Sequence, residues 1–274
     1  MTQADRYCVI GNPIAHSKSP LIHAAFAAAT NQDIQYERCL APLDGFEATV
    51  RDLIKQGYRG ANVTVPFKLE AARLATRLAP RAQAAGAVNT LIFADGEIVG
   101  DNTDGPGLVA DIVRNAGVAL NDKRILLLGA GGAARGALLP LLLQGPRQIV
   151  IANRTLATAE KLVQDFAAHA GKLAVSGFLE IEGGFDVVIN ATSSSLAADV
   201  PPIPPSVFHP GTLALDMMYG NKPTVFMDFA AGHGATVRDG LGMLVEQAAE
   251  AFALWRGVRP DTAQVLAAMR QPQQ

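Results

Sequence analysis

The hydrophobic pattern alternates between two kinds of segment along the chain. Short runs rich in Val, Ile and Leu have the length of buried strands, and alanine-rich runs have the apolar spacing of helices. In the first hundred residues we predict strands at 7–10, 36–40, 60–65, 89–93 and 98–100, and helices at 20–29, 46–56 and 68–78. This alternation predicts an α/β fold with parallel sheets. Asp95-Gly96, between the last two strands, predicts a hairpin turn.

A change of pattern at residues 101–107 precedes a second α/β segment. Beyond it we predict strands at 124–128, 148–152, 186–190, 212–216 and 235–238, and helices at 108–116, after 155 to about 168, 241–256 and 261–270. We place the domain boundary near Asp104 and a second crossing near Gly240. Residues 1–103, completed by 240–274, are therefore expected to form one domain and residues 104–239 the other.

Composition excludes several classes of protein. The 274 residues are 49% apolar with a net charge of -2, which predicts a folded, soluble chain that binds no nucleic acid. Apolar runs are too short to span a bilayer, and no secretory leader is apparent. Cys8 and Cys39 cannot form a disulfide framework, so we expect a cytoplasmic protein. The five histidines are scattered singly, and no metal site is expected.

A glycine-rich turn follows the predicted strand 124–128. The segment Gly129-x-Gly131-x-x-Ala134 lies between this strand and a helical run, as in the dinucleotide-binding fingerprint. Glycine allows close approach of a ligand to the backbone, and free N–H groups at the helix start attract a pyrophosphate. Glycine is also common in turns that bind nothing. The place of this turn between a strand and a helix nevertheless favours a dinucleotide site.

The residues after strand 148–152 distinguish the two nicotinamide cofactors. An NAD site carries an acidic residue there, whereas this chain has Asn153, Arg154 and Thr155. A guanidinium can pair with the 2′-phosphate of NADP, so NADP is the expected cofactor. The alternative is that Arg154 is a solvated cation at a helix start.

The segment from His16 to Pro20 precedes a predicted helix, with Ser19 as the expected N-cap and Pro20 at the first helical position. Hydroxyls and unpaired N–H groups at such a place form a site for a carboxylate. A capped helix without a ligand would explain the same residues.

Lys68 and Asp104 are candidates for proton transfer. Asn62 and Thr64 alternate along strand 60–65 and share one side, and Pro66 leads into the helix whose first turn holds Lys68. Asp104 lies at the predicted domain boundary, where ligands frequently bind. A lysine and a carboxylate beside a dinucleotide site indicate proton exchange with a substrate oxygen during hydride transfer. A surface lysine and a helix-capping aspartate are the alternatives.

Eight motifs, in order along nearly the whole chain, resemble the shikimate dehydrogenase family. In the first half they are Gly11-Asn12-Pro13-Ile14-x-His16-Ser17-x-Ser19-Pro20, Asn62-Val63-Thr64-Val65-Pro66-x-Lys68, Gly86-Ala87-Val88-Asn89-Thr90 and Asp101-Asn102-Thr103-Asp104-Gly105. In the second half they are Gly129-Ala130-Gly131-Gly132-Ala133, Asn153-Arg154-Thr155, Asn190-Ala191-Thr192-Ser193 and Gly240-x-Gly242-Met243-Leu244-x-x-Gln247-Ala248.

The resemblance implies reversible, NADPH-dependent reduction of 3-dehydroshikimate to shikimate, a metal-free step towards chorismate and the aromatic amino acids. It implies that residues 1–103 and 240–274 bind substrate and that the Rossmann-type domain 104–239 binds NADP. Lys68 would donate or accept the proton, supported by Asp104. The implied substrate ligands are Ser17 and Ser19 for the carboxylate, Asn62, Thr64, Asn89, Asp104 and Gln247 for the ring hydroxyls, and Tyr219 nearby. The implied NADP ligands are Gly129, Ala130, Gly131, Gly132, Ala133, Asn153, Arg154, Thr155, Thr192, Met217 and Gly240.

Two positions depart from the family pattern. Thr158 stands where many relatives have a second basic residue, so selectivity for NADP over NAD is expected to be weaker than usual. Ser195 stands where glycine is common. If the backbone there required positive φ, serine would be strained by about 1 kcal/mol or more.

Three other functions stay open. A relative that oxidises quinate as well as shikimate, often with NAD, would carry an acidic residue at the end of the second cofactor strand. A non-catalytic sensor would lack Lys68 or Asp104, or carry a basic DNA-binding extension. A methyltransferase that binds S-adenosylmethionine would also need a ribose carboxylate. The expected partner is a small-molecule substrate, bound by a monomer or a homodimer.

Overall fold

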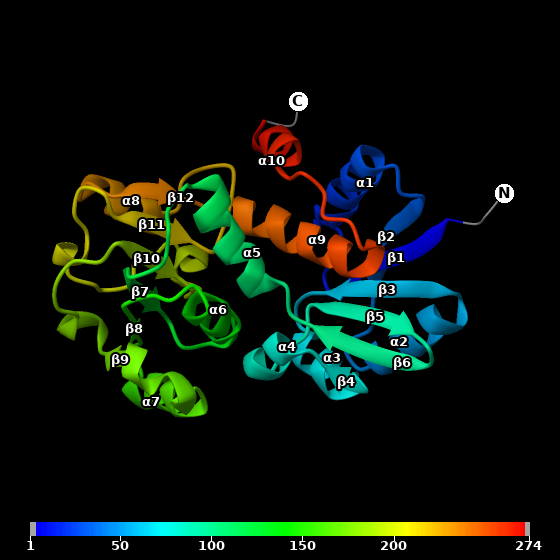
Figure 1. Ribbon diagram of the computed structural model, residues 1–274, viewed down its shortest axis with the longest axis horizontal. Coiled ribbons are helices and arrows are strands. Elements are labelled where there is room, and N and C mark those ends of the chain that lie inside the picture. The colour runs from blue at the N-terminus through cyan, green and yellow to red at the C-terminus, as the bar shows by residue number, and fades with distance from the viewer. Residues whose placement is uncertain (1–3, 272–274) are drawn as a thin grey trace. The chain divides into compact units, whose positions relative to one another are not determined.

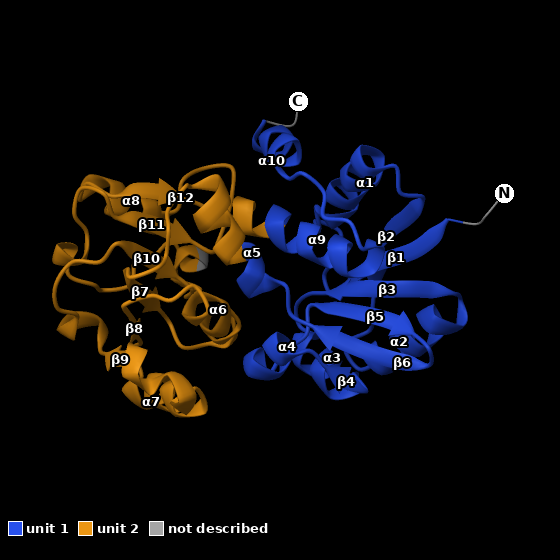
Figure 2. Ribbon diagram, in the orientation of Figure 1, with its two compact units in different colours: residues 1–107, 245–274 blue, residues 108–244 orange. Residues whose placement is uncertain are grey.

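The computed structural model describes residues 4–271. The chain forms two compact units, one made of residues 1–107 and 245–274 and the other of residues 108–244 (Figure 2). We call them unit 1 and unit 2. Unit 1 contains both ends of the chain, whereas unit 2 is continuous in sequence.

Unit 1 is built on a six-stranded sheet with the order β2-β1-β3-β5-β6-β4 (Figure 1). The strands are β1 (Asp5–Gly11), β2 (Ile34–Leu40), β3 (Tyr58–Val63), β4 (Arg77–Leu78), β5 (Thr90–Ala94) and β6 (Glu97–Asp101). β2, β1 and β3 are parallel, while β5 runs antiparallel to β3 and to β6. Asp95 and Gly96 both have positive φ, 52° and 78°, which confirms the predicted hairpin turn and makes this sheet mixed.

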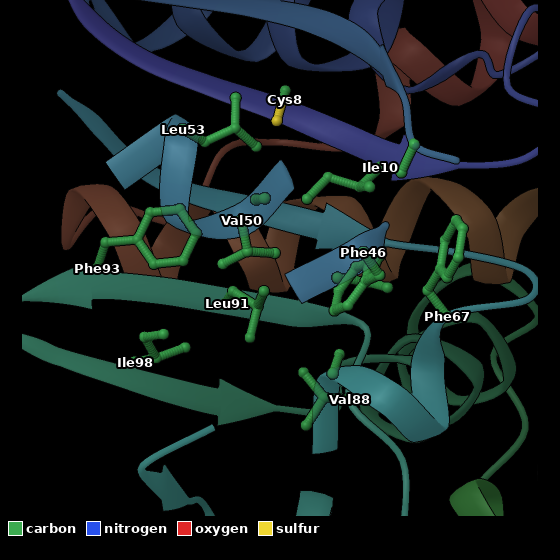
Figure 3. Packing of buried hydrophobic residues seen from close by; sticks show 14 of the residues in the cluster. Cys8, Ile10, Phe46, Val50, Leu53, Phe67, Val88, Leu91, Phe93 and Ile98 are labelled. Carbon is green, nitrogen blue, oxygen red and sulfur yellow. The ribbon is translucent and has the colours of Figure 1, made fainter. Parts of the chain in front are cut away.

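Helices cover both faces of this sheet. They are α1 (Ser19–Thr30), α2 (Phe46–Lys55), α3 (Lys68–Leu74), α4 (Pro80–Ala85), α9 (Leu241–Arg256) and α10 (Ala263–Arg270). On one face Phe46 and Val50 of α2 pack with Phe67 against Ile10 and Leu91 of the strands (Figure 3). On the other face α9 places Trp255 flat against the Tyr7 ring, 4.6 Å between centroids.

The predicted helix 68–78 is wrong at its C-terminal end. α3 stops at Leu74, Ala75 is extended, and Thr76 exchanges hydrogen bonds with Ile98 of β6 before the short strand β4. Pro80 then starts α4, which the pattern did not predict. The strand partner lies more than twenty residues away in sequence, so a local pattern could not reveal it.

Unit 2 is a doubly wound α/β layer. All six strands are parallel, in the order β12-β11-β10-β7-β8-β9 (Figure 1). They are β7 (Arg124–Leu128), β8 (Gln148–Ala152), β9 (Leu173–Ser176), β10 (Val187–Asn190), β11 (Leu213–Asp216) and β12 (Thr236–Arg238). The order in which strands are added to the sheet reverses between β7 and β10, which is the arrangement of a Rossmann fold and confirms the predicted fold class.

The helices of unit 2 include α6 (Gly132–Leu142), α7 (Leu156–Asp165) and α8 (Val225–Gly232), together with the end of α5 (Asp104–Ala110). The predicted helix 108–116 continues α5 as one π-helical turn, Asp111–Asn115. β9 and α8 were not predicted. Thr224 caps α8 by accepting a hydrogen bond from the Met227 N–H at 3.3 Å. Threonine is a favoured N-cap residue, so the sequence does contain a signal for the start of this helix.

Candidate active site

Lys68 and Asp104 form an ion pair in unit 1. Pro66 ends the extended segment after β3, so α3 begins with Lys68, and Asp104 begins α5 just after β6. The Lys68 Nζ lies 2.6 Å from the Asp104 Oδ2, and the two side chains are 32% and 25% exposed. A cation and a carboxylate are thus held together at a place that a small molecule can reach.

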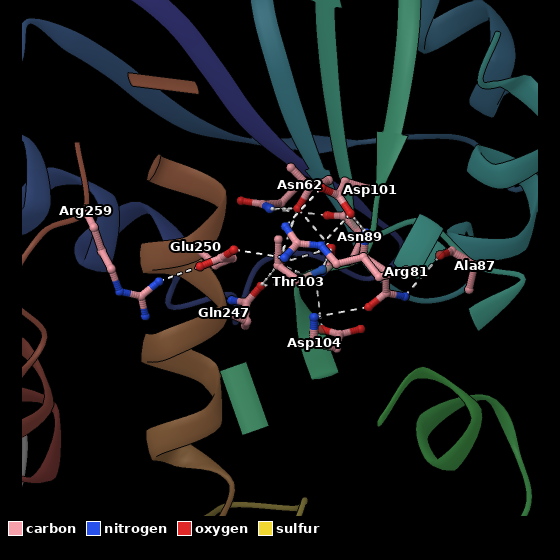
Figure 4. A network of polar contacts seen from close by, with 12 residues as sticks. Asn62, Arg81, Ala87, Asn89, Asp101, Thr103, Asp104, Gln247, Glu250 and Arg259 are labelled. Atoms are coloured by element: carbon pink, nitrogen blue, oxygen red, sulfur yellow. Dashed lines mark hydrogen bonds and ion pairs between the residues drawn. The ribbon is translucent and has the colours of Figure 1, made fainter. Parts of the chain in front are cut away.

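The second oxygen of Asp104 is fixed by a hydrogen bond from Asn89 (Figure 4). The Asn89 Nδ2 lies 2.9 Å from the Asp104 Oδ1, and the Asn102 Oδ1 accepts a hydrogen bond from the Asp104 N–H at 3.1 Å. The Asn89 Oδ1 in turn accepts from the Thr103 N–H at 2.8 Å. Asn89 is only 2% exposed, and its Nδ2 also lies 2.9 Å from the Thr103 Oγ1, so its amide links Asp104 to Thr103.

Two further predicted substrate ligands join the same network. The Gln247 Oε1 lies 3.3 Å from the Asn89 Nδ2, which brings α9 next to β5 (Figure 4). The Asn62 Nδ2 donates to the Asn89 carbonyl oxygen at 3.2 Å. Thr64 follows Asn62 and is half-buried, and its methyl group lies close to Gly11.

Arg81 forms ion pairs with two carboxylates next to this network. Arg81 of α4 donates to both carboxylate oxygens of Asp101, at 2.7 and 2.9 Å, and to Glu250 of α9 at 2.9 Å. Burial disfavours the charged guanidinium, but its bonds to the two carboxylates raise the pKa of Arg81 above its ordinary value. Arg81 therefore stays charged and ties α4, β6 and α9 together beside Asp104.

Ser17 and Ser19 lie at the start of α1. The predicted N-cap is wrong by one residue, because α1 begins at Ser19 and Lys18 occupies the cap position. The Ser17 Oγ accepts from the Ser19 N–H at 3.3 Å, and Arg38 of β2 donates twice to the Ser17 carbonyl oxygen, at 3.1 and 2.6 Å. Arg38 was not predicted, since no local motif marks an arginine on a neighbouring strand.

The glycine-rich turn lies at the point where the strand order of unit 2 reverses. Gly129 follows β7 with φ of 100°, a conformation that favours glycine. A methyl group at this position would lie 3.2 Å from the Thr192 Cγ2, so the turns after β7 and β10 are neighbours. Gly131 and Gly132 face open space, and no side chain caps α6, so its first N–H groups are accessible to an anion.

Arg154 lies exposed at the end of β8. Among residues 4–271 its guanidinium makes no ion pair or hydrogen bond, while the neighbouring Asn153 Nδ2 donates to the Thr155 carbonyl oxygen at 2.9 Å. Thr155 is the N-cap of α7 but makes no side-chain cap. An anionic group would satisfy both the arginine and this helix start, so the residues present fit a 2′-phosphate.

The remaining predicted cofactor residues surround the ends of β10 and β11. The Thr192 Oγ1 hydrogen-bonds the Asn190 Oδ1 at 2.7 Å, and the Met217 N–H donates to the Asn190 carbonyl oxygen at 3.0 Å. Any side chain at Gly240 would overlap the Met217 carbonyl group.

Tyr219, which the resemblance places near the substrate, is 39% exposed. Partial burial raises the pKa of its phenol, which therefore stays protonated at neutral pH.

Ser195 carries no backbone strain, because its φ is not positive; the left-handed residue in this turn is Ala198, with φ of 52°. The Ser195 Oγ instead donates to the buried Asp216 Oδ2 at 2.6 Å. Serine thus adds a hydrogen bond at the position where the family pattern led us to expect glycine.

The described residues contain no cluster of side chains suited to hold a metal ion. None of the helices between residues 4 and 271 has the length and hydrophobicity needed to cross a membrane.

Three family models match the chain. Residues 9–91 match the shikimate dehydrogenase substrate binding domain, residues 111–198 the shikimate / quinate 5-dehydrogenase family, and residues 240–270 the shikimate 5′-dehydrogenase C-terminal domain. The shikimate dehydrogenase (NADP(+)) of Herminiimonas arsenicoxydans is 65% identical over 269 residues, which cover 98% of each chain. The chain belongs to the shikimate dehydrogenase family.

Solved structures agree with this family membership. An Ael1 enzyme from Pseudomonas putida has a TM-score of 0.95 at 51% identity, covering 98% of this chain and 99% of that one. The shikimate 5-dehydrogenase of Thermus thermophilus, solved with NADP(H) and shikimate, has a TM-score of 0.83 at 31% identity, covering 97% and 98%. The resemblance seen in the eight motifs is therefore confirmed.

Proposed function

We propose that this protein catalyses the reversible, NADPH-dependent reduction of 3-dehydroshikimate to shikimate. The observation that carries the proposal is the ion pair of Lys68 and Asp104, 2.6 Å between Nζ and Oδ2, in a chain 65% identical to a shikimate dehydrogenase (NADP(+)). The reaction is a step of the shikimate pathway, which leads to chorismate and the aromatic amino acids.

Lys68 would carry the proton. NADPH, when bound, supplies a hydride to the C3 carbonyl carbon of the substrate. Protonated Lys68 beside the carbonyl oxygen stabilises the negative charge that develops there and donates the proton that completes the hydroxyl. In the oxidative direction neutral Lys68 accepts that proton. Asp104, oriented by Asn89 and Asn102, keeps the Lys68 amine in place.

The predicted ligands in unit 1 would bind the substrate, and those in unit 2 would bind the phosphate groups of NADP. Ser17 and Ser19, at the start of α1, would hold the substrate carboxylate. The ring hydroxyls would be bonded by Asn62, Thr64, Asn89, Asp104 and Gln247. In unit 2 the turn 129–133 would receive the pyrophosphate of NADP, and Arg154 its 2′-phosphate. Two free cysteines and a small-molecule reaction support a cytoplasmic location.

The test is a turnover assay that follows NADPH absorbance with shikimate and NADP. Lys68→Ala should lower kcat by about 100- to 10,000-fold, the usual contribution of a general acid–base group, with KM for shikimate much less changed. The matched control is Lys55→Ala, because Lys55 pairs with Asp52 at 3.0 Å on an exposed helix face.

Unchanged turnover in the Lys68→Ala variant would contradict its role. Faster turnover of quinate with NAD would instead favour the quinate-oxidising alternative. If the wild-type protein binds NADP but turns over neither acid with either cofactor, a sensor function replaces the proposal.

A further inference from the structure

A tyrosine that the family motifs do not mark lies beside a predicted substrate ligand. Tyr36 is on β2 and Asn62 on β3, and β1 lies between them. Tyr36 pairs with Tyr7 of β1 and Asn62 with Val9, two residues apart, so both side chains lie on the same face of the sheet. The Tyr36 hydroxyl crosses β1 and donates to the Asn62 Oδ1 at 2.8 Å.

The Asn62 amide has almost no hydrogen-bonding capacity left. Its Nδ2 donates to the Asn89 carbonyl oxygen at 3.2 Å and to the Thr90 Oγ1 at 3.1 Å, which uses both amide hydrogens. The Asn89 carbonyl oxygen can only accept a hydrogen bond, so the oxygen and nitrogen of the Asn62 side-chain amide cannot exchange places. With Tyr36 bonded to the Oδ1, Asn62 offers a ligand one remaining lone pair and no donor.

The Tyr36 ring is held firmly. The His23 ring of α1 stacks flat on it, with 4.1 Å between centroids and 8° between planes. Burial raises the pKa of Tyr36 well above its ordinary value, and interaction with the Ser19 side chain opposes this only in part. The phenol therefore stays protonated and keeps its single hydrogen for Asn62.

We propose that Tyr36 is a positioning residue of the substrate site, which presents Asn62 as a pure hydrogen-bond acceptor to one ring hydroxyl of the substrate. The inference rests on the proposed function and deepens it. Tyr36 links α1, through the stacked His23 ring, to Asn62, which is expected to bond a ring hydroxyl. It does not touch Lys68 or Asp104, which are fixed by separate hydrogen bonds.

Tyr36→Phe tests the inference, because phenylalanine keeps the stacked ring and removes only the hydroxyl. We expect KM for shikimate to rise by about tenfold, the effect of one lost hydrogen bond, with kcat and the KM for NADP within about twofold. Tyr58→Phe is the matched control. Its hydroxyl accepts from Arg6 at 2.6 Å and also bonds Glu37, so the variant loses a similar buried phenol bond in the same sheet without moving KM.

Substrate analogues locate the contact. Calorimetric binding is compared for shikimate and for two analogues that each lack one of the two non-reacting ring hydroxyls. Tyr36→Phe should weaken binding of shikimate and of one analogue, but not of the analogue that lacks the hydroxyl facing Asn62, because the interaction has already been removed.

The outcomes separate the inference from the proposed function. If wild-type protein turns over shikimate and Tyr36→Phe matches it in KM, the positioning role is refuted and the enzyme assignment stands. The positioning role is also refuted if Tyr36→Phe weakens all three ligands equally, or lowers kcat and thermal stability without changing KM. If wild-type protein neither binds nor turns over shikimate, the proposed function fails first.

Discussion

His23 is a fully buried histidine in the aromatic cluster of unit 1. Neither ring nitrogen has a hydrogen-bond partner within residues 4–271, and the ring stacks on Tyr36 and lies 5.5 Å from the Trp255 ring between centroids. Burial lowers its pKa to about 3. The folded protein therefore holds His23 neutral throughout the neutral and mildly acidic range.

This burial predicts acid sensitivity that His23→Phe should remove. The unfolded chain takes up a proton below its ordinary pKa of about 6.5, whereas the folded state does not until about 3, so stability falls as the pH drops through this window. At about pH 5 the wild-type free energy of unfolding should be lower than at about pH 7 by an extra 2 kcal/mol or so, relative to the variant. Urea unfolding at both pH values measures this.

The control for this prediction is His16→Phe, since His16 is exposed and its substitution should leave the pH dependence as in the wild type. A His23→Phe variant whose stability falls with pH as steeply as that of the wild type would show that the buried ring does not cause the effect.

At the residue scale, the sequence identified those site residues that belong to a short local motif. Lys68 after Pro66 and Asp104 in the segment 101–105 were identified from their motifs, and the structure brings them within 2.6 Å. Tyr36, Arg38 and His23 were missed. Their importance depends on neighbours across the sheet, and a tyrosine or arginine in a strand carries no local sign of such contacts.

At the element scale, the π-helical turn after α5 is fixed by a buried charge. Asp111 is 0% exposed, and Arg238 of β12 donates to its Oδ1 at 2.6 Å and to its Oδ2 at 3.3 Å. Any side chain at Gly242 would overlap this carboxylate, so glycine is required where α9 begins. One ion pair thus joins the turn to the edge strand of the unit 2 sheet.

Arg238→Met should destabilise the protein strongly, because it leaves Asp111 buried without a countercharge. We expect a loss of about 3–5 kcal/mol in the free energy of unfolding, measured by chemical denaturation. Arg147→Met is the control, since the Arg147–Asp122 pair has side chains 63% and 70% exposed and should contribute little to stability. Equal small losses in both variants would contradict the special role of the buried pair.

Element boundaries were predicted well wherever a strand is buried on both faces. Residues 124–128 and 148–152 agree with β7 and β8, because central strands of a parallel sheet are continuous apolar runs. The edge strand β9 was missed since its four residues are only half-buried. The helix 68–78 was extended too far because strand pairing of Thr76 overrides its local helical pattern.

At the scale of the whole molecule, the two units differ in how they are built from the chain. Unit 2 is continuous from residue 108 to 244, with its own sheet and an apolar core that includes Leu126, Phe185 and Phe226. Unit 1 needs α9, whose Trp255 packs on Tyr7 and donates to the Leu91 carbonyl oxygen at 3.0 Å. Arg256 also pairs with Asp5 near the other end of the chain.

A fragment of residues 108–244 should therefore fold alone, and a fragment of residues 1–107 should not. We expect the first to unfold cooperatively by circular dichroism and to bind NADP in calorimetry, because its core and glycine-rich turn are complete. The second lacks the helix that covers Tyr7 and Gly60, and should show no cooperative transition. Cooperative unfolding of fragment 1–107 would contradict this dependence.

The division of unit 1 between the two ends of the chain also has a consequence for biosynthesis. Domains usually complete their folding in the order in which the ribosome makes them. Here β1, β2 and β3 are made first, but α9, which packs on one of their faces, is made only after unit 2 has emerged. During translation the nascent sheet therefore leaves Tyr7 without the ring that covers it until α9 leaves the ribosome.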